Sequence, residues 1–194
     1  MSFMKKILEK NIPIWEECIA TPFIQDLQAG IMPIECFKNY MIQDSIYLKH
    51  YAMVYGKMIY HAQALQEIQL YYSILSFVTK AESVVRLQYL KQFKMMDKDM
   101  EHIMLLPENQ DYIDFLLETA EGGDGKEMLM AVLLCMMSYS YIFRRLATNT
   151  ASRNSRYWDF IKDYADDSYA KGCQEWSDFA DWKCRGFPWQ KKRS

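Results

Sequence analysis

The stretch from Ile34 to His61 contains no proline, and its large apolar residues recur at intervals of three or four positions. These residues are Phe37, Tyr40, Met41, Tyr47, Leu48 and Tyr51. Because that interval places side chains along one side of an α-helix, the pattern predicts a long amphipathic helix. The stretch from Leu65 to Phe93 repeats the rhythm with Ile68, Tyr71, Tyr72, Leu75 and Val78. Helices with one apolar side bury it against other helices, so we expect a bundle.

Turn-forming residues are scarce, with 7 glycines and 5 prolines in 194 residues. All-β folds draw heavily on these residues for tight turns, so an all-α fold is expected. The remaining predicted helices are Met1–Ala20 with an interruption at Pro13, a segment starting at Thr21-Pro22, Gln110–Glu121, Lys126–Ala147 and Tyr157–Trp182. Residues 94–108 are predicted as a short helix and a loop, and residues 148–155 as a polar linker. Together these segments predict a single-domain bundle of about six to eight helices.

Composition and charge narrow the classes of partner. Hydrophobic residues make up 51% of the chain, which allows a substantial core and excludes a mainly disordered state. The formal net charge of -2 gives no reason to expect nucleic acid or an acidic membrane. The longest apolar run, Met128–Met137, has ten residues. A membrane span needs roughly 20, so we expect a buried helix there and no membrane partner.

The cysteines and histidines show no pattern of a disulfide framework or a metal site. The five cysteines are widely spaced and form no CxxC, which suits a reducing compartment, so a cytoplasmic location is expected. His50, His61 and His102 lack the Glu-x-x-His and His-x-x-x-His spacings of helical metal sites. We therefore expect neither a metal nor a cofactor.

Two reactive side chains lie inside predicted helices. Asp44 is three residues before Tyr47 and shares its side of the helix, so it is either exposed or buried with a partner. Cys135 lies in the apolar run, one turn before Tyr139, and is either a small core residue or a reactive thiol. The 14 tyrosines fit two interpretations, a packing core and a pocket for a flat heteroaromatic ligand.

In order along the chain, these motifs resemble the TenA, or thiaminase II, family over about residues 10 to 180. The matching residues are Trp15, Thr21-Pro22-Phe23-Ile24, Leu27, Gly30, Pro33, Phe37, Tyr40, Gln43-Asp44, Tyr47-Leu48, Glu82, Pro107 before Tyr112, Cys135 with Tyr139, and Tyr157 with Phe160-Ile161 and Tyr164. Two positions depart from the family pattern, because Arg86 replaces a frequent histidine and Leu134 a frequent proline.

The resemblance implies a haem-oxygenase-like helical bundle that binds no haem and assembles as a homotetramer. It also implies a hydrolase of thiamine salvage that releases 4-amino-5-hydroxymethyl-2-methylpyrimidine from aminomethyl or formylaminomethyl precursors, and more slowly from thiamine. Carried over by position, Cys135 is the nucleophile and Asp44 binds the amino edge of the pyrimidine. The implied pocket is lined by Tyr47, Tyr112, Tyr139 and Tyr164.

The C-terminal part of the chain departs from the family. Family members continue into a last helix with a glutamate that acts as acid and base opposite the cysteine, and no such helix is found here. We expect the bundle to cover residues 1–182 and an atypical basic tail to cover residues 183–194. A missing acid leaves open a weakly active or non-catalytic pyrimidine-binding protein, or a regulatory one. A quinone-cofactor synthase or oxidase of the same fold is disfavoured because histidines are few.

Overall fold

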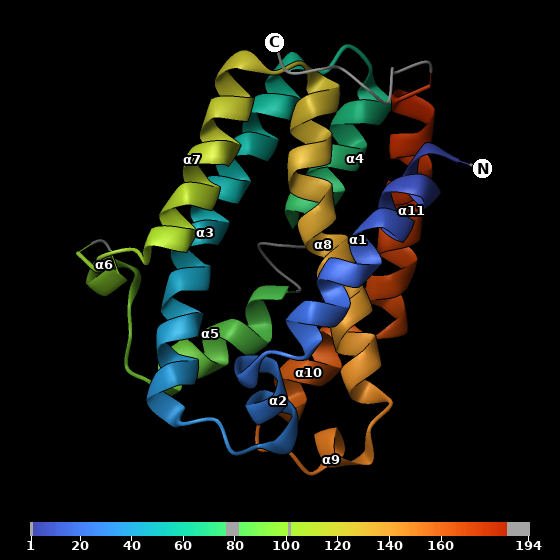
Figure 1. Ribbon diagram of the computed structural model, residues 1–194. Helices are drawn as coiled ribbons and strands as arrows, with labels where there is room; N and C mark the ends of the chain where they lie inside the picture. Colours follow the sequence, from blue (N-terminus) through green and yellow to red (C-terminus); the bar gives the residue numbers. More distant parts are fainter. Residues whose placement is uncertain (1, 77–81, 101, 186–194) are drawn as a thin grey trace.

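The computed structural model describes residues 2–76, 82–100 and 102–185, with the side chains of residues 82, 83, 97 and 98 also outside the description. Within these ranges the chain folds into eleven helices and contains no strand (Figure 1). The helices are α1 Phe3–Ile19, α2 Pro22–Ala29, α3 Ile34–His61, α4 Leu65–Ser76, α5 Glu82–Gln92, α6 Asp97–Met100, α7 Pro107–Gly122, α8 Gly125–Ala147, α9 Thr150–Arg153, α10 Trp158–Ala165 and α11 Asp167–Lys183. The predicted all-α bundle is confirmed, although it has more and shorter helices than the six to eight expected.

Helix α8 occupies the centre of the bundle, in contact with α1, α3, α7, α10 and α11 (Figure 1). Its Leu129, Val132 and Leu133 side chains are completely buried. By length and composition alone α8 could also cross a membrane. The helices packed around α8 bury its apolar side chains, and that burial stabilises the core of a bundle.

Several helix ends lie where the sequence places them. Pro22 begins α2, and Gly30 ends it in the left-handed conformation with φ 73°. A Cβ at Gly30 would lie 3.0 Å from the Ser155 backbone, so the position needs glycine for space as well as for its backbone angle. Helix α8 starts with a capping box, in which the Asp124 carboxylate accepts from the Glu127 N–H while the Glu127 side chain accepts from the Asp124 N–H.

Three segments differ from the sequence prediction. Helix α1 runs through Pro13 without a break, and α9 lies inside the expected linker. The expected helix over Tyr157–Trp182 is two helices that meet at Asp166, whose side chain caps α11 by accepting from the Ser168 N–H. The Leu65–Phe93 segment forms α4 and α5, with residues 77–81 outside the described ranges. Propensity and periodicity do not encode such breaks, because tertiary packing decides them.

The last described helix, α11, is fastened to the bundle at its end. Lys183 forms a largely buried ion pair with Glu67 of α4, and Cys184 is buried. Residues 186–194, which include most of the expected tail, lie outside the description. The absence of the family's last helix therefore stays a prediction.

Candidate active site

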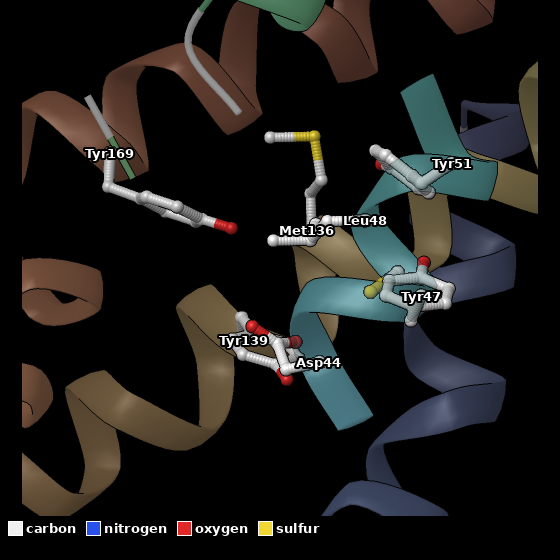
Figure 2. Close-up of a pocket in the computed structure, with 8 residues that line it drawn as sticks. Asp44, Tyr47, Leu48, Tyr51, Met136, Tyr139 and Tyr169 are labelled. Atoms are coloured by element: carbon white, nitrogen blue, oxygen red, sulfur yellow. The ribbon is translucent and has the colours of Figure 1, made fainter. Parts of the chain in front are cut away.

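A small cavity lies where α3, α8 and α11 meet. It is lined by Asp44, Tyr47, Leu48 and Tyr51 from α3, by Cys135, Met136 and Tyr139 from α8, and by Tyr169 from α11 (Figure 2). Its volume is about 10 Å³ measured to the centre of a water-sized sphere, which is room for one water molecule. Packing of α3 and α11 against α8 is what brings these distant segments together.

Asp44 is buried, so the exposed alternative left open by the sequence is wrong. Among the described residues, no hydrogen-bond donor reaches its Oδ2 atom. Burial raises the pKa of Asp44 from 3.8 to about 6, while the nearby positive charge of Arg86 on α5 acts in the opposite direction and lowers it. Asp44 therefore offers a buried acceptor that a ligand can satisfy, and it carries a negative charge above pH 6.

Cys135 and Tyr47 meet across the cavity from different helices. Cys135 is partly buried, and its thiol interacts with the Tyr47 hydroxyl. Burial, followed by the charge of Cys135, raises the pKa of Tyr47 well above its ordinary value, so its hydroxyl keeps its proton. Within the described chain no conventional hydrogen-bond partner serves that hydroxyl. A protonated phenol beside a thiol can donate a hydrogen bond to the sulfur when it ionises.

The other predicted tyrosines differ in their distance from the cavity. Tyr139 lines it, and its hydroxyl shares a 2.6 Å hydrogen bond with the Tyr40 hydroxyl. Tyr112 of α7 stacks on Tyr47, with ring centres 5.4 Å apart and an interplanar angle of 15°. Tyr164 packs behind Tyr139, with ring centres 4.9 Å apart. Cys135, Asp44, Tyr47 and Tyr139 thus share the cavity, whereas Tyr112 and Tyr164 support its walls from behind.

Sequence reasoning did not assign four of the lining residues. Leu48 and Tyr51 follow Tyr47 within one turn of α3, so helix geometry could have found them. Met136 follows Cys135 directly and could have been found in the same way. Tyr169 comes from α11, and its hydroxyl points toward Met136 (Figure 2). Only the tertiary packing of α11 on α8 places Tyr169 there, and no local signal reports that packing.

Gln43 of α3 fastens the segment that leads into α7. Its Nε2 donates to the Met104 carbonyl at 3.1 Å, and its Oε1 accepts from the Leu106 N–H at 3.0 Å and from Asn109 Nδ2 at 3.1 Å. Asn109 Nδ2 also donates to the Gln43 carbonyl at 2.9 Å. Because Asn109 lies in the first turn of α7, these bonds fix the helix that carries Tyr112.

Replacing Gln43 by alanine is expected to lower the free energy of unfolding by about 2–3 kcal/mol, because the side-chain amide bonds are lost and buried polar groups lose their partners. Chemical denaturation followed by circular dichroism measures the change. Gln110→Ala is the matched control, since within the described residues the exposed Gln110 side-chain amide bonds to Asp114 alone, and it should cost less than about 0.5 kcal/mol. Equal losses in the two variants would show that the Gln43 bonds contribute nothing specific.

Comparison with known proteins places the chain in a family. The family model described as TENA/THI-4/PQQC matches residues 9–187. The chain belongs to this family. An aminopyrimidine aminohydrolase of Halalkalibacterium halodurans is 29% identical over 183 residues, which cover 94% of this chain and 79% of that protein. An aminopyrimidine aminohydrolase of Helicobacter pylori is 26% identical over 165 residues, covering 84% of this chain and 76% of that protein.

Solved structures of the TenA family share the fold. A TenA homologue from P. horikoshii superposes with a TM-score of 0.83 at 23% identity, covering 94% of this chain and 85% of that one. A protein from Silicibacter, described as a TenA family transcription regulator, superposes with a TM-score of 0.82 at 21% identity, covering 95% and 81%. These likenesses confirm the TenA-like all-α fold expected from the sequence.

Proposed function

We propose that this TenA-family protein is an aminopyrimidine hydrolase of thiamine salvage that uses Cys135 as its nucleophile. The observation that carries the proposal is the convergence of the Cys135 thiol and the buried Asp44 carboxylate on one tyrosine-walled cavity. The relatives named aminopyrimidine aminohydrolase support the hydrolase activity. The proposed substrates are 4-amino-2-methylpyrimidines with an aminomethyl or formylaminomethyl group at position 5, and thiamine as a slower one.

The proposed reaction proceeds through a covalent adduct with Cys135, in two stages. The Cys135 thiolate adds to the electron-poor pyrimidine ring, and the adduct expels the aminomethyl nitrogen, which carries its extra proton near neutral pH and so leaves as ammonia. Water then adds at that methylene carbon, one proton is lost, and the carbon–sulfur bond breaks to return the thiolate and release the hydroxymethylpyrimidine. Two easier barriers replace one difficult displacement. Asp44 accepts a hydrogen bond from the ring amino group, which orients the ring and rejects rings without the amine.

The cavity is smaller than the proposed ligand. A space that holds one water molecule does not hold a substituted six-membered ring, so lining side chains must move when the substrate binds. Met136 is the residue best suited to that movement, because an unbranched thioether side chain changes rotamer at low cost. Tyr169 of α11 lies beside Met136 and lines the same cavity (Figure 2).

The proton steps determine how fast the proposed reaction runs. Asp44 is the single carboxylate among the cavity-lining residues of the described chain, and the proposal already uses it as an acceptor for the ring. Without a separate acid and base, turnover is lower by about 10²–10⁴-fold than in a hydrolase that has one. We propose a homotetramer in the cytoplasm, in which a partner chain can supply such a group.

Incubating the wild-type protein with 4-amino-5-aminomethyl-2-methylpyrimidine is expected to yield the hydroxymethyl product and ammonia in equal amounts. Liquid chromatography and an ammonia assay measure the two products over time. Calorimetric titration with the hydroxymethyl product reports binding independently of turnover. Binding without any product release would favour the second candidate, a non-catalytic pyrimidine-binding protein, which the shortage of carboxylates at the cavity supports. If the protein neither binds the product nor releases it from the substrate, both candidates are excluded.

A further inference from the structure

The Arg86 side chain reaches from α5 to the part of α3 that carries Asp44. Its Nη1 donates to the Ser45 hydroxyl at 2.8 Å, and that hydroxyl donates in turn to the Met41 carbonyl at 2.7 Å. Ser45 is buried and directly follows Asp44 on α3. The buried hydroxyl therefore holds the guanidinium near the Asp44 carboxylate, on which its positive charge acts.

We propose that Arg86 is a positioning residue that keeps the Asp44 carboxylate ionised and its Oδ2 available for the amino group of a bound aminopyrimidine. This inference rests on the proposed function for its ligand. A buried carboxylate loses its charge unless a compensating charge lies nearby. Arginine supplies a charge that does not titrate in the physiological range, whereas a histidine at the same position would lose its charge near neutral pH.

The charges around Asp44 single out Arg86 for this role. From α8, Cys135 and Tyr139 face the carboxylate, and from α11 Tyr169 lines the same cavity. None of these groups carries a positive charge. Tyr139 and Asp44 repel each other when both are ionised, which contributes to raising the pKa of Tyr139, after burial and Tyr40. Among the described groups acting on Asp44, Arg86 is the one that lowers its pKa.

The test follows the titration of Asp44 in the protein without ligand. The difference in unfolding free energy between wild type and Asp44→Asn is measured from pH 4 to pH 9, and the same difference is measured in the Arg86→Gln background. The difference grows from the unfolded-state pKa upward and stops growing at the folded-state pKa, so the pH at which it levels off gives the titration midpoint of Asp44 in the folded protein. We expect this midpoint to rise by about one pH unit or more when the positive charge is removed. Arg86→Lys, which keeps the charge, should leave the midpoint within about 0.5 pH unit of wild type.

Ligand binding provides the second readout. In Arg86→Gln the dissociation constant of the hydroxymethylpyrimidine at pH 6.5 should rise by about threefold or more, and it should return toward the wild-type value at pH 8.5 as Asp44 ionises. A purely structural role for Arg86 would weaken binding equally at both pH values. Ser45→Ala, which removes the hydrogen bond but keeps the charge, should have a smaller effect. Glu82→Gln is measured alongside, because this acidic residue lies one turn before Arg86 on α5 and its side chain is not described.

The outcomes separate this inference from the proposed function. An unchanged Asp44 midpoint in Arg86→Gln, or a loss of binding that is the same at both pH values, overturns the role of Arg86 even if the protein hydrolyses aminopyrimidines. A larger midpoint shift in Glu82→Gln than in Arg86→Gln would also overturn it. If Arg86→Gln shifts the midpoint but the wild-type protein binds no aminopyrimidine, the coupling of Arg86 to Asp44 is supported and the proposed ligand is excluded.

Discussion

A Cys135→Ser variant is expected to lose turnover of an aminopyrimidine by at least about a thousandfold while it still binds the pyrimidine product. Serine nearly preserves the size of the side chain, so the cavity walls keep their places. Its hydroxyl does not ionise near neutral pH, and it therefore cannot form the covalent adduct in which the amine departs. The measurements are steady-state turnover numbers for both proteins and calorimetric titration with the hydroxymethylpyrimidine.

Cys36→Ser is the matched control for this experiment. Cys36 is exposed in the first turn of α3, on the same helix as Asp44 but outside the cavity. Its replacement should leave both turnover and binding unchanged. Equal turnover in wild type and Cys135→Ser would remove Cys135 from the mechanism, and equal losses in the two serine variants would point to a general thiol effect.

An Asp44→Asn variant is expected to bind the pyrimidine at least about a hundredfold more weakly and yet to be more stable than wild type at pH 8. The folded protein holds the Asp44 proton more tightly than the unfolded chain, because burial raises the pKa from 3.8 to about 6. The charge therefore costs nothing below pH 3.8, and its cost grows to about 3 kcal/mol as the pH rises through 6. Removing it should stabilise the fold by about 1–3 kcal/mol at pH 8 and by nothing at pH 3.5.

Denaturation curves at the two pH values, together with calorimetric titration, test both halves of that expectation. Asp163→Asn is a suitable control, because burial also raises the pKa of Asp163 to about 6 although this residue of α10 is not among those lining the cavity. It should become more stable at pH 8 with unchanged affinity for the pyrimidine. If Asp44→Asn binds as well as wild type, Asp44 does not contact the ring.

Local sequence signals predicted most of the helices because local interactions decide those segments. The glycines Gly122 and Gly123 separate the helices predicted over Gln110–Glu121 and Lys126–Ala147, and α7 ends and α8 begins there. The break between α10 and α11 was not predicted, since Asp166 could equally lie inside a continuous helix. Helix α1 continues through Pro13 while Met4 and Trp15, on either side of it, are buried in the core. Tertiary contacts of this kind cannot be read from one segment.

The candidate site was likewise predictable only in part from the sequence. Asp44 and Tyr47 share a side of one helix, and Cys135 and Tyr139 share a side of another, so each pair could be predicted from spacing. That the two pairs belong to one site came from the family resemblance. The contribution of Tyr169, the hydrogen bonds of Gln43 and the approach of Arg86 through Ser45 all depend on how separate helices cross. Helix crossings depend on side-chain packing along their whole length, which a single sequence pattern does not specify.

Because the cavity has room for one water molecule, widening it governs both the affinity for the ligand and the protection of the Cys135 thiol. Only the widened state of the walls admits a pyrimidine, so the apparent dissociation constant is the intrinsic one divided by the population of that state. Electrophiles and oxidants larger than water that approach the sulfur of Cys135 through the cavity need the same widened state. A sequence change that favours widening therefore tightens ligand binding and speeds oxidative loss of the thiol by the same factor.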